Sequence, residues 1–256
     1  MDLGFKGKTV VITGGTKGIG SGISEVFAME GANLIIDYRS NKDNSSEAFI
    51  QGLREKYNVK AFGIMQDLAD PNCAKNIFDF ALEQFGRIDV LINNAGGSNE
   101  SKEIQDITLE EWNTALINNV TQYYLMGSEF AKRLIASKQK GSIVNVLSKA
   151  SMTTTTKGRA CYVTNKTAQM GLTKQMAVDL SQYGIIVNGI MPGSVMNQRM
   201  AKRDEEYMAE RVKRMPLGKI NDPIEIGYYV AFLASEKNQV AVGAPCDATG
   251  GMLLGF

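Results

Sequence analysis

Short apolar runs of the strand type alternate with longer segments of helical periodicity along most of the chain. The runs KTVVITG (8–14), NLIIDY (33–38) and VKAFGIMQ (59–66) are each followed by a helical pattern, and the order continues through IDVLINNAG (88–96), GSIVNVLS (141–148) and GIIVNGIMPG (184–193). Strands that alternate with helices pair in parallel, because each helix carries the chain back along the sheet. Right-handed crossovers then place helices on both faces of the sheet. The sequence therefore predicts an α/β fold with a doubly wound parallel sheet of about seven strands.

The length of the chain favours one domain. A chain of 256 residues can bury one large core, and no linker rich in Pro, Gly or Ser interrupts it. We expect a single domain over 1–256, in which the segment at about 194–215, with its mixed charges and methionines, forms a lid over the substrate. The start of the chain has no pattern of a secretory leader, and no apolar run approaches membrane-spanning length. We therefore expect a cytoplasmic protein.

The charge balance and the missing histidine exclude several classes of function. Lys and Arg number 28 against 27 for Asp and Glu, so no net field attracts nucleic acid or an anionic membrane. The chain contains no histidine, which removes the base of a Ser-His-Asp hydrolase. Cys73, Cys161 and Cys246 lie far apart, which argues against a disulfide framework and against a metal site. A small-molecule partner and another proton-transferring group are expected.

The glycine-rich stretch TGGTKGIG (13–20) follows the first predicted strand and leads into a helical pattern. Glycines at 14, 18 and 20 permit a tight turn and a close approach of the backbone, and the free N–H groups at the start of a helix bind anions. The stretch therefore predicts a loop that binds the pyrophosphate of a dinucleotide. A plain strand-to-helix turn is the alternative.

Charged residues near the end of the second predicted strand bear on the choice of dinucleotide. Asp37 could accept a hydrogen bond from a ribose hydroxyl, whereas Arg39 could pair with a 2′-phosphate. Lys17, in the glycine-rich stretch, adds a second cation, and two cations around one carboxylate favour a phosphate. The pattern favours NADP, with NAD as the alternative. The other interpretation is that both cations are solvated surface charges.

Tyr162 and Lys166 stand four residues apart in a segment of helical spacing, so their side chains share one face of the predicted helix. A tyrosine hydroxyl normally has a pKa near 10; lowering it by about three units requires roughly 4 kcal/mol, and one ammonium about 4 Å away supplies about that much. The phenol would then serve as general acid or base toward a carbonyl or an alcohol. Ser148 ends a predicted strand at the edge where ligands bind, and its hydroxyl could donate to a developing alkoxide. Taken alone, the Tyr-Lys pair is also compatible with an exposed helix surface.

Six elements occur in order along the chain: TGGTKGIG, NNAG at 93–96, Asn119, Ser148, Tyr162-x-x-x-Lys166 and Pro192-Gly193. Together they resemble the short-chain dehydrogenase/reductase family over essentially the whole chain. The resemblance implies a Rossmann fold and an NAD(P)-dependent oxidoreductase that acts on CH–OH donors, with Asn119, Ser148, Tyr162 and Lys166 as a catalytic tetrad. In this assignment Tyr162 exchanges the proton, Lys166 assists it and binds the nicotinamide ribose, Ser148 holds the substrate oxygen, and Asn119 positions a water. Asn119 is preferred to Asn118 because of its spacing from Trp112.

The same resemblance implies which residues contact the cofactor. They follow the ends of successive strands: Gly14, Thr16, Lys17, Gly18, Ile19, Gly20, Arg39, Ser40, Asp67, Leu68, Asn94, Ala95, Gly96, Tyr162, Lys166, Pro192, Gly193, Val195 and Asn197.

Two departures from the family pattern lie near the expected substrate site. The motif P-G-x-x-x-T ends in Asn197, so an amide would have to make the contact to the nicotinamide, or the contact is lost. The interval from Ser148 to Tyr162 is one residue longer than the common spacing and contains TTTT (153–156). The tail GAPCDATGGMLLGF (243–256) resembles a segment that many members bury between subunits, which predicts a homotetramer or a dimer.

The sequence leaves the substrate open. Our first hypothesis is an NADP-preferring oxidoreductase for a secondary alcohol or ketone, with a hydroxysteroid or another hydrophobic ketone suggested by methionines at 191, 196, 200, 208 and 215. A 3-oxoacyl thioester reductase and a sugar or polyol dehydrogenase are the alternatives within the family. Tyr183 stands where acyl-carrier-dependent reductases often carry a basic residue, which disfavours the former. A dinucleotide-binding regulator without turnover is the alternative from another class, and the intact Tyr162 and Lys166 argue against it.

Overall fold

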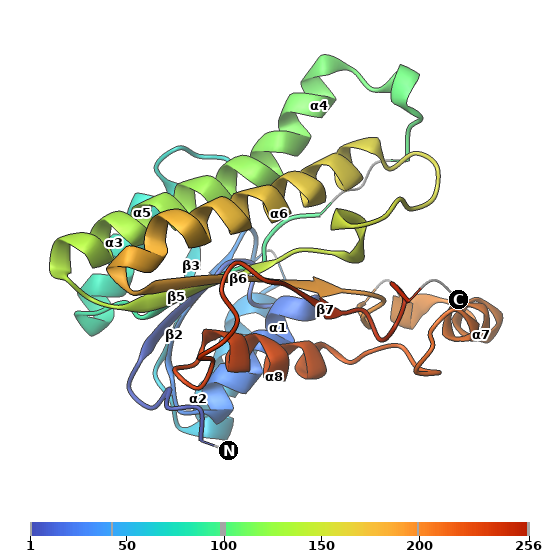
Figure 1. The fold of residues 1–256 in the computed structure, drawn as a ribbon. Coiled ribbons are helices and arrows are strands. Elements are labelled where there is room, and N and C mark those ends of the chain that lie inside the picture. Colours follow the sequence, from blue (N-terminus) through green and yellow to red (C-terminus); the bar gives the residue numbers. More distant parts are fainter. Residues whose placement is uncertain (1, 42, 98–100, 199, 255–256) are drawn as a thin grey trace.

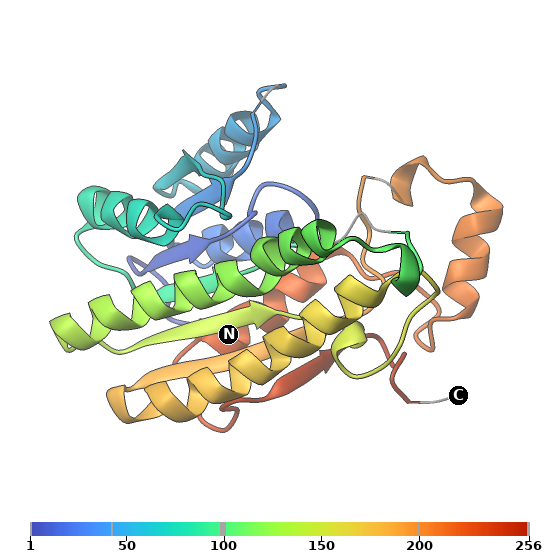
Figure 2. The same ribbon diagram turned by 90° about the horizontal axis from the view of Figure 1, so that it is seen from above.

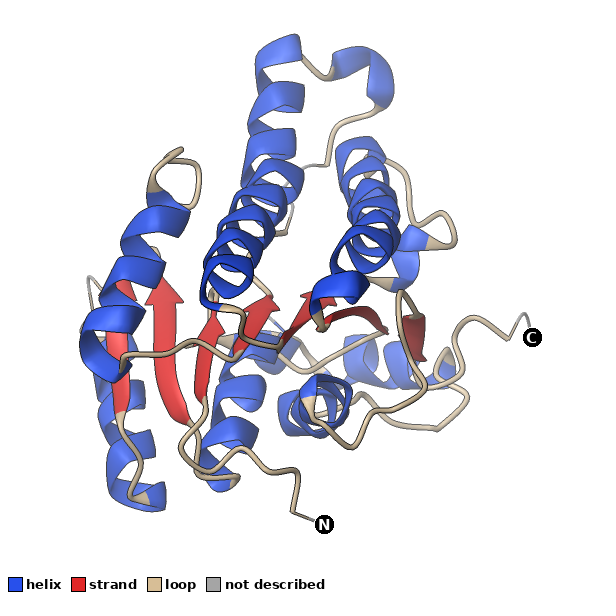
Figure 3. Cartoon of the chain, turned by 60° about the vertical axis from the view of Figure 1, so that its left-hand side comes forward, coloured by secondary structure: helices blue, strands red, loops and turns tan. Residues whose placement is uncertain are grey.

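The computed structural model describes residues 2–41, 43–97, 101–198 and 200–254. Its centre is one seven-stranded sheet in the order β3-β2-β1-β4-β5-β6-β7, with helices on both faces (Figures 1 and 3). Every neighbouring pair of strands is parallel, which confirms the predicted doubly wound fold. The strands are β1 (Thr9–Ile12), β2 (Asn33–Tyr38), β3 (Ala61–Met65), β4 (Val90–Asn93), β5 (Gly141–Val146), β6 (Ile185–Pro192) and β7 (Pro245–Ala248).

The helices form a layer on each face of the sheet, and one further helix lies beyond the carboxyl ends of the strands. One layer contains α1 (Gly18–Met29), α2 (Ser45–Tyr57) and α8 (Pro223–Ala234), and the opposite layer contains α3 (Cys73–Phe85), α5 (Gln122–Ser137) and α6 (Ala160–Leu180) (Figure 1). Helix α4 (Leu109–Leu116) runs into α5 through a π-helical turn at Ile117–Thr121. Helix α7 (Glu205–Lys213) lies beyond the carboxyl ends of the strands (Figure 2).

The strands are apolar on both faces because helices cover both. In β1, Val10 and Ile12 pack into the core under α1, α2 and α8, whereas Val11 packs into the core under α3, α5 and α6. All three side chains are fully buried. Burial on both faces explains why the strands appear in the sequence as unbroken apolar runs and not as alternating patterns.

The strand order reverses between β1 and β4, and this reversal locates the site. From β1 the chain builds outward through β2 and β3 on one side, and from β4 through β5, β6 and β7 on the other. The loops that leave the carboxyl ends of β1 and β4 therefore diverge, and a crevice opens between them. The six apolar runs predicted as strands all form strands, and β7 forms in the C-terminal segment 243–256.

The structure differs from the sequence-based expectation at three helices. Helix α1 begins at Gly18, inside the glycine-rich stretch, and not after it. The helical segment from Leu109 to Ser137 contains the π-helical turn, which no sequence pattern indicated. Helix α8 was not predicted, although Asp222 and Glu225 form a capping box at its start and Pro223 occupies its first turn.

Large apolar side chains near the C-terminal part of the chain are exposed. Val240 is 89% exposed and Leu254 is 65% exposed, and Tyr228 on α8 is about half exposed. Association of subunits would cover such groups, so the homotetramer or dimer stays a prediction that light scattering can test. Among the described residues, no helix is both long and apolar enough to cross a lipid bilayer.

Candidate active site

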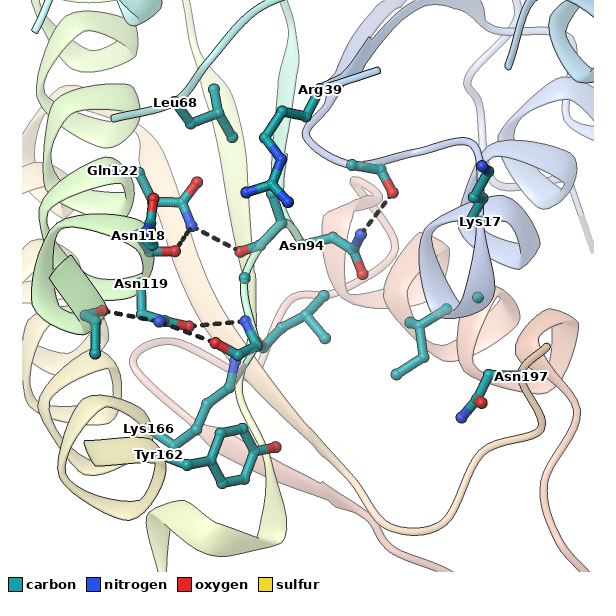
Figure 4. Close-up of a pocket in the computed structure, with 18 of the residues that line it drawn as sticks. Lys17, Arg39, Leu68, Asn94, Asn118, Asn119, Gln122, Tyr162, Lys166 and Asn197 are labelled. Atoms are coloured by element: carbon teal, nitrogen blue, oxygen red, sulfur yellow. Dashed lines mark hydrogen bonds between the residues drawn. The ribbon is translucent and has the colours of Figure 1, made fainter. Parts of the chain in front are cut away.

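A cleft of about 1240 Å³ lies at the carboxyl ends of the strands, and most of the predicted site residues line it. One end is bordered by the glycine-rich loop and the ends of β2 and β3, and the other by α4, α6 and the segment that follows β6 (Figure 4). The predicted residues that line it are Gly14, Lys17, Gly18, Ile19, Arg39, Asp67, Leu68, Asn94, Ala95, Gly96, Asn119, Tyr162, Lys166, Gly193, Val195 and Asn197. Thr16, Gly20, Ser40, Ser148 and Pro192 do not contribute to its lining.

The glycine-rich loop presents free backbone donors at the start of α1. Lys17 is the N-cap residue and makes no side-chain capping hydrogen bond, and the first turn contains no acidic residue. Gly14 and Gly18 have φ of +60° and +55°, a region that side chains disfavour. A Cβ on Gly20 would lie 2.2 Å from the carbonyl oxygen of Gly14. The loop thus requires these glycines, and the uncapped helix start fits a pyrophosphate.

Hydrogen bonds fix the glycine-rich loop to the end of β4. The hydroxyl of Thr13 accepts from the backbone N–H groups of Asn94 and Ala95, at 2.9 and 3.0 Å. The amide of Asn94 donates to the carbonyl oxygens of Thr13 and Gly14 (Figure 4). These bonds join the two diverging loops at the bottom of the crevice. Thr13 was not among the predicted site residues, although it is the first residue of the glycine-rich stretch.

The end of β2 forms a second, smaller hollow of about 840 Å³ beside the cleft. Arg39 lines both cavities, and Ser40 lines the smaller one, together with Tyr38, Asn41 and Met65. The Thr16 hydroxyl is hydrogen-bonded to that of Ser46, which donates to the Ser40 carbonyl oxygen. Lys17 also borders the cleft (Figure 4). Two exposed cations therefore lie at the end of the cleft where a ribose 2′-phosphate was predicted.

Asp37 is a buried carboxyl on the cleft wall. One oxygen accepts from the backbone N–H of Gly14 at 3.2 Å, and the other has no hydrogen-bond partner among the described residues. Burial raises the pKa of Asp37 to about 7, and the nearby charge of Asp67 acts in the same direction. One oxygen of this carboxyl thus supports the glycine-rich loop, and the unpaired oxygen is compatible with a ribose hydroxyl as donor.

Lys166 is almost completely buried, one helical turn after Tyr162 on α6. Its ammonium donates to the carbonyl oxygen of Val146 at 2.9 Å, and the hydroxyl of Tyr123 donates to the same oxygen. The ammonium lies 5.7 Å from the centre of the Tyr123 ring. Desolvation lowers the pKa of Lys166 to about 7. Figure 4 shows the Tyr162 ring and the Lys166 chain side by side, with the hydroxyl and the ammonium pointing in different directions.

Asn119 lies in the π-helical turn, and hydrogen bonds of its side-chain amide fix its position. Its amide oxygen accepts from the Gly97 N–H at 2.9 Å, and its amide nitrogen donates to the carbonyl oxygens of Gly97 and Ala115. Gln122 donates to the Ala95 carbonyl oxygen at 3.0 Å (Figure 4). The π-helical turn thus connects the end of β4 to α5 on the wall of the cleft. No sequence signal pointed to Gln122.

Ser148 lies two residues beyond the end of β5, at the N-cap of a short 3-10 turn (Lys149–Ser151). Its hydroxyl oxygen accepts from the Ala150 N–H at 3.2 Å, and the side chain is buried. The hydroxyl proton therefore remains available to donate. Val146 and Leu147, just before it, line the cleft, whereas Ser148 does not.

Polar and apolar side chains both line the far end of the cleft. Of the five methionines considered as a pocket lining, Met196 and Met200 border the cleft, whereas Met191 and Met215 are buried in the core. Asn197 lines the cleft, and its amide oxygen accepts from the Met200 N–H at 3.1 Å. The polar or charged lining groups at this end are Ser101, Lys102, Glu110, Glu111, Thr114, Asn118, Gln198 and Arg211, and the apolar side chains of Ala115, Val146, Leu147 and Val195 line the cleft as well.

The two buried ionisable groups predict a minimum in stability near neutral pH for the cofactor-free protein. The pKa of Asp37 is raised on folding, so the stability falls as pH rises from about 4 to 7, where the folded state holds the extra proton. The pKa of Lys166 is lowered on folding, so the stability rises again between about pH 7 and 10, where the unfolded state holds it. Across each of these pH ranges the free energy of unfolding changes by at most about 4 kcal/mol.

Urea unfolding at several pH values measures these slopes. Asp37→Asn should flatten the curve below pH 7, and Lys166→Met should flatten it above pH 7. Identical curves of stability against pH for the unmodified protein and both variants would show that folding shifts the pKa of neither group.

The comparisons with known proteins agree with the fold and with the cleft. A family model described as short chain dehydrogenase matches residues 8–208. An L-rhamnose 1-dehydrogenase (NADP(+)) of Thermoplasma acidophilum is 32% identical over 98% of each chain. A 3-oxoacyl-[acyl-carrier-protein] reductase of Aquifex aeolicus is 30% identical over 98% of this chain and 100% of its own.

A solved structure shows the same architecture. The L-sorbose reductase of Gluconobacter frateurii, in complex with NADPH and L-sorbose, has a TM-score of 0.91 at 26% identity, with 99% of both chains covered. With the parallel sheet, the glycine-rich loop and the Tyr-Lys helix in one cleft, these matches identify the chain as a member of the short-chain dehydrogenase/reductase family, an NAD(P)-dependent oxidoreductase acting on CH–OH or carbonyl groups.

Proposed function

We propose that the protein is an NADP-preferring oxidoreductase that interconverts a secondary alcohol and a ketone, with Tyr162 as general acid and base. The observation that carries this proposal is that Tyr162 and Lys166 open onto the same cleft as the glycine-rich loop. The cofactor would lie along that cleft, with its pyrophosphate at the uncapped start of α1. Its 2′-phosphate would lie near Arg39 and Lys17. When bound, the nicotinamide supplies or accepts the hydride.

The side chains at the other end of the cleft perform the proton transfer. In alcohol oxidation, the Tyr162 phenolate takes the hydroxyl proton, and in ketone reduction the phenol returns it. Ser148 donates a hydrogen bond to the substrate oxygen as charge develops there. Lys166 would exchange its bond to Val146 for one to a ribose hydroxyl, which would bring its charge toward the phenol. Asn119 holds the strand-end segment at Gly97 in place, and its assigned role at a water rests on the family resemblance.

The lining of the cleft favours a sugar or polyol as substrate over a hydroxysteroid. At the substrate end, two cationic and two anionic side chains border the cleft, and one pair of them, Lys102 and Glu111, forms an ion pair. These polar side chains of balanced charge can pair with hydroxyl groups, whereas an apolar steroid would leave them unsatisfied. The names of the rhamnose dehydrogenase and the sorbose reductase support the same class.

Part of the segment at 194–215 borders the cleft. We propose that residues 194–215, which include α7, act as the substrate lid, because Met196, Gln198 and Arg211 of this segment border the cleft. The carrier-dependent 3-oxoacyl alternative is disfavoured by Tyr183, which stands where such reductases often carry a basic residue.

A coupled absorbance assay tests the proposed function. NADP reduction would be followed with a panel of aldoses, polyols and hydroxysteroids, and NADPH oxidation with the matching ketones and a 3-oxoacyl thioester. We expect turnover with at least one sugar or polyol, and a higher kcat/KM with NADP than with NAD. Turnover restricted to steroids or thioesters would overturn the substrate class, and equal use of both dinucleotides would overturn the cofactor preference.

A further inference from the structure

Arg159 lies against the ring of Tyr162, and neither the tetrad nor the cofactor site accounts for it. Its guanidinium carbon is 4.6 Å from the centre of the Tyr162 ring, within the range of a cation-π contact. Arg159 is the N-cap residue of α6, three residues before Tyr162, so the two side chains meet at the first turn of the helix. The contact is made by the same aromatic ring that is proposed to exchange the proton.

The backbone on both sides of Arg159 is held at the rim of the cleft. Arg159 pairs with Lys102 in an isolated parallel bridge. Gly158 has a φ of +74°, and a Cβ there would lie 3.0 Å from the backbone of Ser101. Lys102 forms an ion pair with Glu111, whose carboxylate also belongs to the capping box of α4. The backbone at Arg159 is therefore held against a segment that lines the cleft.

The two cations near Tyr162 differ in kind. Burial lowers the pKa of Lys166 to about 7, and its ammonium is engaged by the Val146 carbonyl oxygen. A guanidinium stays protonated throughout the range of enzyme assays, and its flat face stacks on an aromatic ring. A permanent positive charge thus contacts the ring while the charge of the lysine varies with pH and with its partner.

We propose that Arg159 is a positioning residue of the catalytic centre, which acts through Tyr162 by stabilising its ionised form and holding the plane of its ring. The inference rests on the proposed function, because it gives Tyr162 the proton-transfer role. Charged or titratable groups also lie on the other elements around this turn: Lys166 on α6, Tyr123 on α5, Lys149 on the 3-10 turn, and Lys102, Glu110 and Glu111 at the cleft rim. Of the cations around this turn, Arg159 contacts the Tyr162 ring, and Lys166 donates to the Val146 carbonyl oxygen.

The test is the pH profile of alcohol oxidation by Arg159→Gln and Arg159→Lys. Loss of the charge should move the acid limb of kcat to higher pH by about half to one pH unit, because more hydroxide is then needed to ionise the phenol. At a fixed pH on that limb, kcat should fall about three- to tenfold. Arg159→Lys keeps the charge and should restore most of the limb. A rise in KM with an unmoved limb would show a substrate-binding role and would overturn the proposal.

A second readout does not require the substrate. NMR of protein with 13C-labelled tyrosine follows the titration of the Tyr162 phenol, which Tyr162→Phe identifies by loss of its signal. The midpoint should rise in Arg159→Gln, and in Arg159→Met should the glutamine variant not fold. An unmoved midpoint overturns the inference even where no panel compound is turned over, which would be the separate failure of the proposed function.

The matched control is Lys56→Gln. The Lys56 ammonium lies 5.0 Å from the Tyr57 ring on α2, outside the lining of the cleft. This variant also removes one cation from a tyrosine ring. Because that tyrosine lies outside the cleft, the acid limb of kcat should stay in place. An equal movement of the limb in this variant would assign the effect to net charge and overturn the role of Arg159.

Discussion

Tyr162→Phe is expected to lower kcat for alcohol oxidation by a factor of about 10² to 10⁴, because general acid–base catalysis contributes about that much. The change removes one hydroxyl and leaves the ring, so the contact with Arg159 and the packing over Lys166 persist. Cofactor affinity, measured by fluorescence titration, should remain within a few-fold of the unmodified protein. The loss should appear equally in kcat and kcat/KM, since the missing interaction exists in the transition state.

The control for this variant is Tyr124→Phe. Tyr124 is on α5, is 55% exposed, and does not line the cleft. It loses the same hydroxyl and should retain full turnover. Unchanged turnover in Tyr162→Phe would reject the general acid–base role, and an equal loss in both variants would point to folding and not to chemistry.

Arg39→Gln is expected to weaken NADPH binding about tenfold to a hundredfold, because a charge-assisted bond to a phosphate is worth about 1.5 to 3 kcal/mol. NADH lacks the 2′-phosphate, so its dissociation constant should change little. Arg39→Gln combined with Lys17→Gln should weaken NADPH further. Isothermal titration with both dinucleotides measures the ratio of the two affinities.

Lys237→Gln is the control for the loss of an exposed cation. Lys237 lines neither the cleft nor the smaller hollow and should leave both affinities unchanged. A parallel loss of NADPH and NADH affinity in Arg39→Gln would contradict the assignment, because it would place Arg39 at a part shared by both dinucleotides.

Much of the fold could be predicted because the periodic patterns are strong and local. The run NLIIDY coincides with β2, and the helical pattern that follows it is α2. The segment of helical spacing that carries Tyr162 and Lys166 is α6, with Arg159 as its N-cap. The start of α1 was placed too late, because a glycine-rich helix start without a capping side chain lacks the usual signal. The π-helical turn could not be predicted, since it changes the hydrogen bonding of a helix without a change in residue type.

The site could be predicted as far as its residues follow the ends of strands. Gly14, Asn94 and Tyr162 were expected on one cleft, and the structure places them there. The polar substrate end could not be foreseen, because it joins segments near 101–118 to segments near 198–211, and the methionines that suggested an apolar pocket lie partly in the core. The backbone at Arg159 is likewise held by a distant segment, through its bridge to Lys102, which the sequence did not indicate.

The π-helical turn at Ile117–Thr121 holds one residue more than an α-helical path of the same length would need. Loss of one codon in this stretch would remove that extra residue, and the turn would close into a regular α-helix while α4 and α5 keep their rotation relative to each other. The bulge from which the Asn119 side chain reaches Gly97 would be lost. A one-codon deletion elsewhere in α4 or α5 would instead turn one helix by about 100° against the other.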